Sequence, residues 1–295
     1  MILVAGGSGL LGRKVVQLLD ANGEDVRVLS RDPARAAGLP AGAQVVTGDL
    51  RRGRLDAVVG GCSCVISVVH GFTGPTRTSP AAVDKGGNSR LIAAATRAGV
   101  ERFVLGSVVG AGPHHPMSLH RMKYAAEQEL HNSGLTGVTV RATPFMQTWL
   151  DLIGAKVAAG GPALVMGPGT NPINFVSADD VATFICLAAL GDPRIGTEIT
   201  VGGPDDLSFL DLAQHLLTLR GRSDSPRHVP LSALKALAAL ARPINPDLAR
   251  KAKAAVVMNT TDMTLDASPS RRRFPEVAAS TLADVTRSTH SAHPR

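Results

Sequence analysis

The first twelve residues of the chain constrain its fold more than any other segment. Residues 1–5 are apolar and predict a short buried strand, and three glycines follow it, spaced three apart, at Gly6, Gly9 and Gly12. Glycine at these positions permits a tight turn, a close approach of a pyrophosphate to the backbone, and close packing of the next helix on the strand. The segment therefore predicts the phosphate-binding turn of a dinucleotide site.

A helix is predicted directly after this turn, because apolar residues repeat at helical spacing from Leu10 to Leu19 and Gly23 is placed to end them. The N–H groups and dipole at its start favour a bound anion. A phosphate-binding loop of the nucleotide-hydrolase type is excluded, since Arg13 and Lys14 stand where it needs Lys and then Ser or Thr. An ordinary glycine-rich turn is the remaining alternative. The cofactor contacts expected here are Gly6, Ser8, Gly9, Leu10, Leu11 and Gly12.

The end of the second predicted strand, residues 25–30, indicates which dinucleotide binds. Arg31 stands about twenty residues beyond the glycines, where a carboxylate would hold a ribose 2′-hydroxyl. A guanidinium there can instead bind a 2′-phosphate through two hydrogen bonds, which predicts NADP(H). Arg35 and Arg13 are candidates to add to that pocket. The alternative is that Arg31 is a solvated loop residue beside Asp32.

Further strands are predicted at residues 44–47, 64–69 and 102–106, separated by helical segments that include residues 81–98. This alternation predicts an α/β fold of the Rossmann type, with a doubly wound parallel sheet whose ligands collect at the carboxyl ends of the strands. At those ends we expect cofactor contacts from Asp49, Leu50, Val69, His70 and Ser107. Asp49 would lie beside the adenine, or alternatively cap the next turn.

The chain resembles the atypical short-chain dehydrogenase/reductase superfamily, in its NmrA-like branch, over roughly residues 1 to 210. The resemblance rests on the segment Gly6 to Gly12, Arg31, Gly48-Asp49-Leu50, the segment Arg102 to Ser107 and the pairing of Lys123 with Glu127. It implies an NADP-binding fold with a catalytic Ser, Tyr and Lys.

Within that resemblance, Lys123 matches the lysine that hydrogen-bonds the nicotinamide ribose and lowers the pKa of the tyrosine. Pro144 falls in a segment similar to the one whose backbone borders the nicotinamide ring.

The tyrosine of that active site is missing. Leu119 occupies its expected position, and the only tyrosine, Tyr124, follows Lys123 and so points elsewhere on the helix. His120 is a candidate proton donor, because imidazole titrates near neutrality and a spacing of three residues from Lys123 places both on one helix face. A solvated or capping histidine is the alternative. The predicted catalytic residues are Lys123, His120 and Ser107.

Composition shifts toward Pro, Ala and Leu from about Ser223, with helices predicted near residues 231–241 and 246–258. We expect a Rossmann core over residues 1–144, with further core elements in 173–203. A smaller, mainly helical substrate-covering subdomain would comprise residues 145–172 and 204–295. Its apolar wall suits a hydrophobic or aromatic ligand, or alternatively forms a helical core or dimer face. The tail after Ala283 is predicted to fray.

Charge and aromatic content exclude a nucleic-acid partner. The net charge is +7, yet apart from Arg271 to Arg273 the basic residues are scattered, and only 3% of residues are aromatic. No membrane partner is expected either, because the apolar stretch 231–241 is too short to span a bilayer and contains Lys235.

The cysteines lack the spacing of a zinc site, and His114 and His115 lack a third ligand, so no metal is expected. Cys62, Cys64 and Cys186 are predicted to be reduced core thiols. With no secretory leader evident, the chain is expected to be a cytoplasmic monomer or homodimer.

Two functions remain open from the sequence. The first is an NADPH-dependent reductase of a hydrophobic carbonyl compound, quinone or enone, working without the usual tyrosine. The alternative is a non-catalytic protein that senses NADP(H) and acts through a protein partner.

Overall fold

The computed structural model describes residues 1–72 and 78–292. The chain divides into two compact units, one made of Met1–Ala142 and Ala178–Val201, the other of Thr143–Ser177 and Gly202–Arg295. The predicted boundaries differ at 143–144, 173–177 and 202–203, which belong to the second unit. The reason at 173–177 is strand pairing: β8 (Ile173–Asn174) pairs with β10 (Asp206–Leu207) of the same unit and not with the central sheet.

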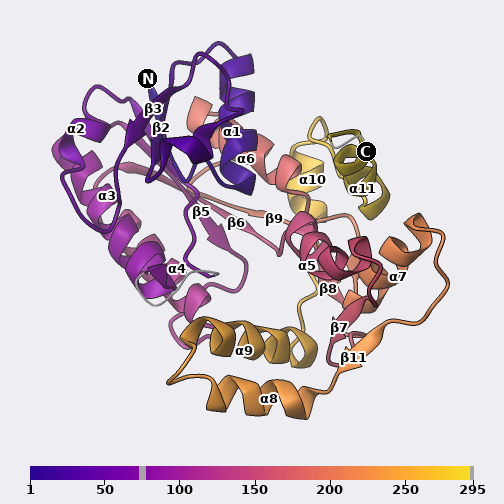
Figure 1. The fold of residues 1–295 in the computed structure, drawn as a ribbon. Helices are drawn as coiled ribbons and strands as arrows, with labels where there is room; N and C mark the ends of the chain where they lie inside the picture. The colour runs from indigo at the N-terminus through magenta and orange to yellow at the C-terminus, as the bar shows by residue number, and fades with distance from the viewer. Residues whose placement is uncertain (73–77, 293–295) are drawn as a thin grey trace. The chain divides into compact units, whose positions relative to one another are not determined.

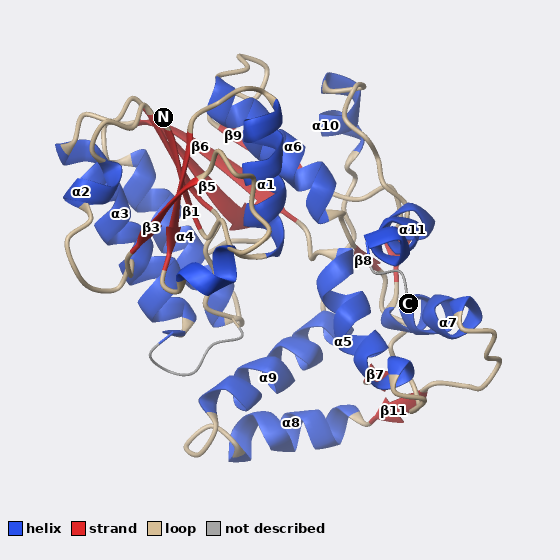
Figure 2. Cartoon of the chain, turned by 45° about the horizontal axis from the view of Figure 1, so that its top comes forward, coloured by secondary structure: helices blue, strands red, loops and turns tan. Residues whose placement is uncertain are grey.

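The first unit is built on a seven-stranded sheet in the order β3-β2-β1-β4-β5-β6-β9, and every neighbouring pair is parallel. Helices cover both faces, with α1 and α6 on one face and α2, α3 and α4 on the other (Figures 1 and 2). The predicted doubly wound α/β fold is confirmed. The strands are β1 (Ile2–Ala5), β2 (Val26–Ser30), β3 (Gln44–Thr47), β4 (Cys64–Ser67), β5 (Arg102–Val108), β6 (Thr136–Ala142) and β9 (Glu198–Val201). The helices are α1 (Leu10–Ala21), α2 (Asp56–Val59), α3 (Gly86–Arg97), α4 (Ser118–His131) and α6 (Ala178–Leu190).

The strand order places a binding crevice beside β1. The chain leaves β1 toward β2 and β3 on one side, and later strands continue from β4 on the other, so the order reverses there. Connections at such a point leave in opposite directions and open a crevice at the carboxyl ends of the strands. β1 and β4 are buried along their whole length, as expected of central parallel strands.

The predicted helix over residues 81–98 is not uniform. It begins as a π-helical turn, η3 (Ala81–Lys85), and continues as α3. The turn carries Asp84, which is completely buried. Such π turns are often found at functional sites.

All three cysteines are buried and free, as predicted. Burial raises the pKa of the Cys62 thiol, and it raises the pKa values of Cys64 and Cys186 to about 12. These thiols therefore stay protonated at neutral pH.

The second unit combines helices with two small sheets, β8 with β10 and β7 (Leu164–Met166) with β11 (Arg227–Val229). Its core contains the tilted ring pairs Trp149–Phe209 and Phe175–Phe209. No helix among residues 1–72 and 78–292 is long and apolar enough to cross a membrane. The helices of this unit are α5 (Met146–Ala158), α7 (Phe209–Leu219), α8 (Leu231–Leu240), α9 (Pro246–Thr260), α10 (Ser268–Arg273) and α11 (Leu282–Ala292).

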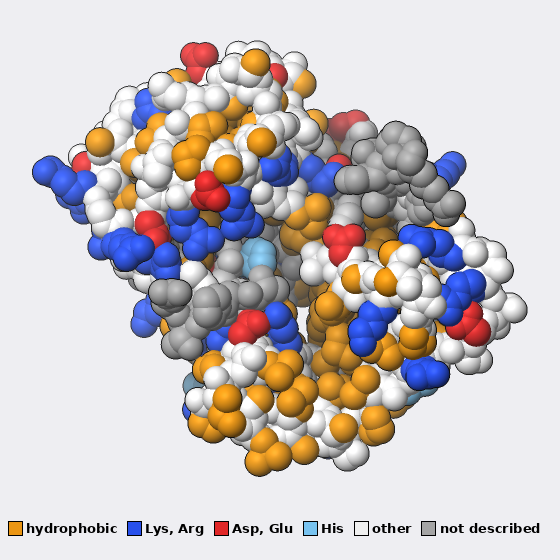
Figure 3. Space-filling view, in the orientation of Figure 1, with side chains coloured by type: hydrophobic (Ala, Val, Ile, Leu, Met, Phe, Trp, Pro, Cys, Tyr) orange, Lys and Arg blue, Asp and Glu red, His pale blue; other side chains and the backbone are white. Residues whose placement is uncertain are grey.

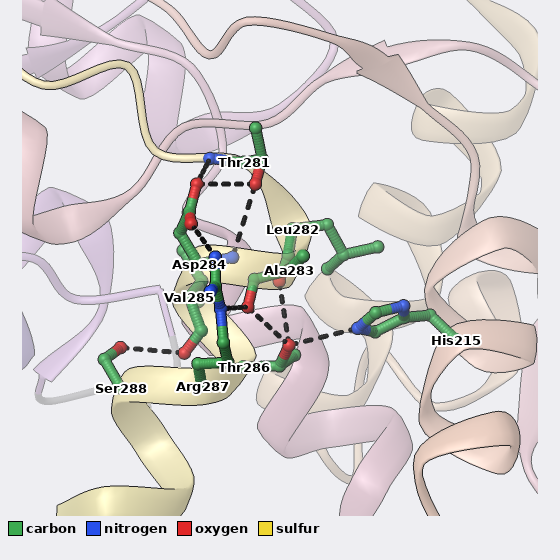
Figure 4. A network of polar contacts seen from close by, with 9 residues as sticks. All are labelled: His215, Thr281, Leu282, Ala283, Asp284, Val285, Thr286, Arg287 and Ser288. Atoms are coloured by element: carbon green, nitrogen blue, oxygen red, sulfur yellow. Dashed lines mark hydrogen bonds and ion pairs between the residues drawn. The ribbon is translucent and has the colours of Figure 1, made fainter.

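The predicted fraying after Ala283 is wrong up to Ala292, because this segment forms α11 (Figure 4), and residues 293–295 lie outside the described residues. The side chains and backbone amides of Thr281 and Asp284 hydrogen-bond reciprocally and cap the start of this helix. Thr286 then hydrogen-bonds His215 of α7 at 3.0 Å. A capped start and this side-chain contact hold a segment whose composition alone suggests disorder.

Candidate functional site

The glycine turn after β1 is closely packed against its surroundings. Gly6 has a φ of +91°, and a Cβ atom there would lie 3.0 Å from the carbonyl of Val68. A Cβ on Gly12 would lie 2.1 Å from the Gly6 oxygen, closer than any side chain allows. Gly7, which the spacing argument passed over, is also constrained, since its Cβ would lie 2.8 Å from a Val28 methyl. Only glycine at these three positions therefore permits this tight turn and the close packing of α1 against it.

Gly9 has a different environment, suited to a ligand. It is the N-cap of α1, and no side chain caps the N–H groups of the first turn. The nearest atom to an added Cβ is the Gly6 oxygen at 3.3 Å, and no acidic residue lies in the first helical turn. Uncapped N–H groups and the positive end of the helix dipole favour an anion such as a pyrophosphate.

A cavity of about 490 Å³ lies at the carboxyl ends of β1 to β4. It brings together eight of the predicted cofactor residues, which come from four separate strand ends. Leu10, Leu11, Gly12, Ser107 and Lys123 do not line it, and Pro144 belongs to the second unit, so their cofactor contacts stay predictions. The eight are Gly6, Ser8, Gly9, Arg31, Asp49, Leu50, Val69 and His70.

The charge of the cavity is predominantly positive. Arg31, Arg35 and Arg51 all line it, against one carboxylate, Asp49. Arg51 donates hydrogen bonds to both oxygens of Asp49, one of them at 2.9 Å, and this contact lowers the pKa of Asp49 to about 2. The Asp49 carboxylate also accepts from the Arg51 backbone N–H, so it does hold the turn, as the capping alternative predicted.

Arg51 was not identified from the sequence as a residue of the cavity. The signal was a basic residue two positions after an acidic strand-end residue, but this spacing alone does not show that both side chains face the cavity.

Arg13 does not line the cavity, although it was a candidate for the 2′-phosphate pocket. Its guanidinium donates to the backbone oxygens of Ala37 at 2.8 Å, Ser8 at 3.2 Å and Arg35. Arg13 therefore connects the glycine turn to the 3₁₀ turn η1 (Pro33–Ala36), which carries Arg35.

The ammonium of Lys123 is directed into the protein. It donates to the backbone oxygens of Val69 and Gly106, each at 2.8 Å, and lies 3.2 Å from a carboxylate oxygen of Asp84. The two backbone oxygens accept hydrogen bonds from the ammonium, while the Asp84 oxygen contacts it as an ion pair. The Lys123 side chain is 4% exposed, so its predicted contact with the ribose stays a prediction that this geometry does not favour.

Asp84 extends this contact to the segment that follows β4. Its second carboxylate oxygen accepts from the N–H of Gly71 at 2.7 Å, and its backbone oxygen accepts from Asn88. Asp84 and Lys123 together thus hold Val69 and Gly71, on either side of the cavity residue His70. Sequence reasoning missed Asp84, although an acidic residue inside an apolar helical run was a visible signal.

Ser107 belongs to a second buried network. It lies within β5, not at its tip, because the strand continues to Val108. Its hydroxyl donates to Glu127, which also accepts two hydrogen bonds from Arg141, at 3.0 and 2.6 Å. The hydroxyl proton is therefore directed to a carboxylate.

His120 is buried and stacks on His115, with ring centroids 3.8 Å apart. Burial, with a smaller contribution from His115, lowers the pKa of His120 to about 3. The imidazole is neutral at neutral pH, so the expectation that it supplies a proton, which rested on an ordinary pKa, is not supported. His114 is exposed and His115 is occupied by this stack. The described residues contain no group of three or more possible metal ligands.

Several known proteins are similar in sequence to this chain. Residues 6–193 match a family model described as NAD(P)H-binding. An NAD(P)H azoreductase of Xenophilus azovorans is 33% identical over 224 residues, covering 75% of this chain and 74% of that protein. A photosystem II assembly factor of Trieres chinensis is 29% identical over 237 residues, covering 79% and 73%.

Among solved structures, an NADPH-dependent quinone oxidoreductase from Escherichia coli in complex with NADPH superposes with a TM-score of 0.77. The two chains share 19% identity, and the match covers 99% of this chain and 100% of the other. At that identity the likeness shows the fold alone.

Proposed function

Because this chain belongs to the NAD(P)H-binding domain family, related to the NmrA-like atypical short-chain dehydrogenases/reductases, we propose that it is an NADPH-dependent reductase of a hydrophobic carbonyl compound, quinone or enone. The observation that carries the proposal is the cavity in which an uncapped helix start and three guanidiniums lie together. The azoreductase relative supports a reductase. The apolar composition of residues 145–172 and 204–295 is the reason for proposing a hydrophobic substrate.

The preference for NADPH over NADH rests on Arg31 and Arg35. A 2′-phosphate carries a double negative charge, which guanidiniums bind in a bidentate manner. The only acidic residue among the cavity residues described, Asp49, is neutralised by Arg51 and therefore repels the phosphate little. NADH lacks this group and gains nothing from the arginines.

Bound NADPH would supply the hydride, and the residues of this chain would bind and orient it. The helix start at Gly9 would hold the pyrophosphate, and Lys123 would orient the nicotinamide half through the segment 69–71.

The usual proton donors of such a site are missing or occupied. No tyrosine stands four residues before Lys123, Ser107 donates to Glu127, and His120 is neutral. His120 can therefore offer at most a neutral N–H to a developing oxyanion, so catalysis would rest on positioning and electrostatics.

The proposal is tested by incubating the purified chain with NADPH and a panel of quinones, enones and azo dyes. We expect the absorbance of the reduced nicotinamide to fall faster than in a protein-free control for at least one substrate. Cofactor binding is measured in parallel by titration. Tight NADPH binding without turnover of any compound would contradict the reductase.

The second candidate is a non-catalytic NADP(H) sensor that acts through a protein partner. Leu119 at the tyrosine position favours it, and so does the relative named as an assembly factor. A sensor must distinguish the redox states of its ligand. Equal dissociation constants for NADP and NADPH would therefore count against this candidate.

A further inference from the structure

The helical hairpin formed by α8 and α9, residues 231–260, exposes an unusual number of apolar side chains. In α8 only Leu234 is buried, although the helix is made almost entirely of Leu and Ala. Hydrophobic side chains cover the outer surface of α8 in the space-filling view (Figure 3). The exposed fractions are 74% for Leu240, 87% for Ile244, 39% for Leu248 and 36% for Leu237.

The same hairpin is strongly basic. Lys235, Arg242, Lys251 and Lys253 are exposed on it. Its one acidic residue, Asp247, is already paired with Lys251 at 2.7 Å and with Arg250 at 3.2 Å. A hairpin that exposes apolar and basic side chains together, with no unpaired acid, is complementary to a surface that is apolar inside and anionic outside.

We propose that the α8–α9 hairpin docks on a lipid bilayer that carries anionic headgroups. Leu240 and Ile244 would enter the boundary between headgroups and acyl chains, while Lys235 and Arg242 contact lipid phosphates. The sequence expectation of no membrane partner considered only a spanning helix. A helix that lies on the surface has no such length requirement, and α8 has ten residues.

A second copy of the chain is the less suitable occupant of this surface. A two-fold interface brings the same patch of both copies together, so the basic residues of one hairpin would face those of the other. Like charges placed opposite one another oppose association. The inference goes beyond the proposed reductase activity and does not depend on it, because its test measures binding to lipid.

The test is sedimentation of the full chain with vesicles of phosphatidylcholine, with and without phosphatidylserine. We expect binding to the vesicles that contain phosphatidylserine, weakened about tenfold or more by Lys235→Gln with Arg242→Gln and by raised salt. The double variant Leu240→Asp/Ile244→Asp should lose binding while keeping its melting temperature, since both side chains are exposed.

The matched control is Leu152→Asp, which changes a leucine that is 54% exposed on α5 and should bind vesicles as the unmodified chain does. Equal binding to both kinds of vesicle, or no binding to either, would overturn the proposal. So would a dimer in sedimentation velocity that Leu240→Asp/Ile244→Asp dissociates while vesicle binding stays unchanged.

Discussion

Asp84 and Lys123 form an ion pair of 3.2 Å in which the side chains are 0% and 4% exposed. Asp84 comes from the π turn before α3 and Lys123 from α4, so the pair joins two helices beneath the ends of β4 and β5. Its remaining hydrogen bonds reach Val69, Gly71 and Gly106. The pair therefore fixes backbone beside the cavity, and Lys123 is best described as a positioning residue.

Lys123→Met should destabilise the fold by about 3–5 kcal/mol, because it leaves the Asp84 carboxylate buried without its partner. Urea denaturation measures this loss. The control is Lys14→Met, which removes a partly exposed ion pair with Asp179 and should cost less than about 1 kcal/mol. The double variant Asp84→Asn/Lys123→Met should be more stable than the sum of the single changes implies, since no unpaired charge remains.

Asp84→Asn separates positioning from direct cofactor contact. It retains the ammonium of Lys123 but weakens the hold on Gly71, so we expect a higher dissociation constant for NADPH. Isothermal titration with NADPH measures it. Unchanged affinity in Asp84→Asn together with lost affinity in Lys123→Met would instead place Lys123 on the ribose.

Gly9→Ala should weaken cofactor binding, whereas Gly12→Ala should lower the stability of the fold. A methyl on Gly12 would meet the Gly6 oxygen at 2.1 Å, so this variant should lose about 1–3 kcal/mol of folding free energy. A methyl on Gly9 meets only a 3.3 Å neighbour and should leave the melting temperature nearly unchanged while weakening NADPH binding. Gly86→Ala, in a helix with room for the methyl, is the control for both. Full cofactor affinity in Gly9→Ala would show that the pyrophosphate does not bind at this turn.

Arg31→Asp should reduce the affinity for NADPH roughly tenfold to a hundredfold, because a charge-assisted contact is replaced by repulsion. The affinity for NADH should change little. Fluorescence titration of both cofactors measures the ratio, with Arg54→Ala as the control, since Arg54 is exposed and does not line the cavity. Equal losses for the two cofactors would locate the 2′-phosphate elsewhere.

His120 should make the fold sensitive to acid. Its pKa is lowered from 6.5 to about 3, so the unfolded chain binds the proton that the folded chain excludes. Stability should therefore fall as pH drops from about 6.5 toward 3, by at most about 1.4 kcal/mol per pH unit for this group. His120→Phe should flatten that dependence in urea denaturation between about pH 6 and pH 4. The exposed His114→Gln should not, and an equal slope in both variants would contradict the assignment.

Local sequence patterns predicted the sheet and several elements closely. The strand at residues 44–47 and the helix that begins at Leu10 lie where the apolar runs indicated. These features depend on neighbours within a few positions, so a single sequence contains them. The glycine turn after β1 was predictable for the same reason.

The interior of the site was not predictable in this way. The partners of Lys123 come from residues 69, 84 and 106, and those of Ser107 from α4. Such contacts depend on how the helices pack on the sheet. The spacing of residues along the chain does not predict that packing. The pKa of His120 likewise depends on burial and on the ring of His115 and not on local sequence.

The burial of Cys62, Cys64 and Cys186 bears on how the chain tolerates its proposed substrates. Quinones and enones are electrophiles that alkylate thiolates, and a thiol with a pKa of about 12 is ionised at neutral pH in only roughly one molecule in 10⁵. A reductase with its thiols enclosed in this way can turn over reactive compounds repeatedly without being consumed by them.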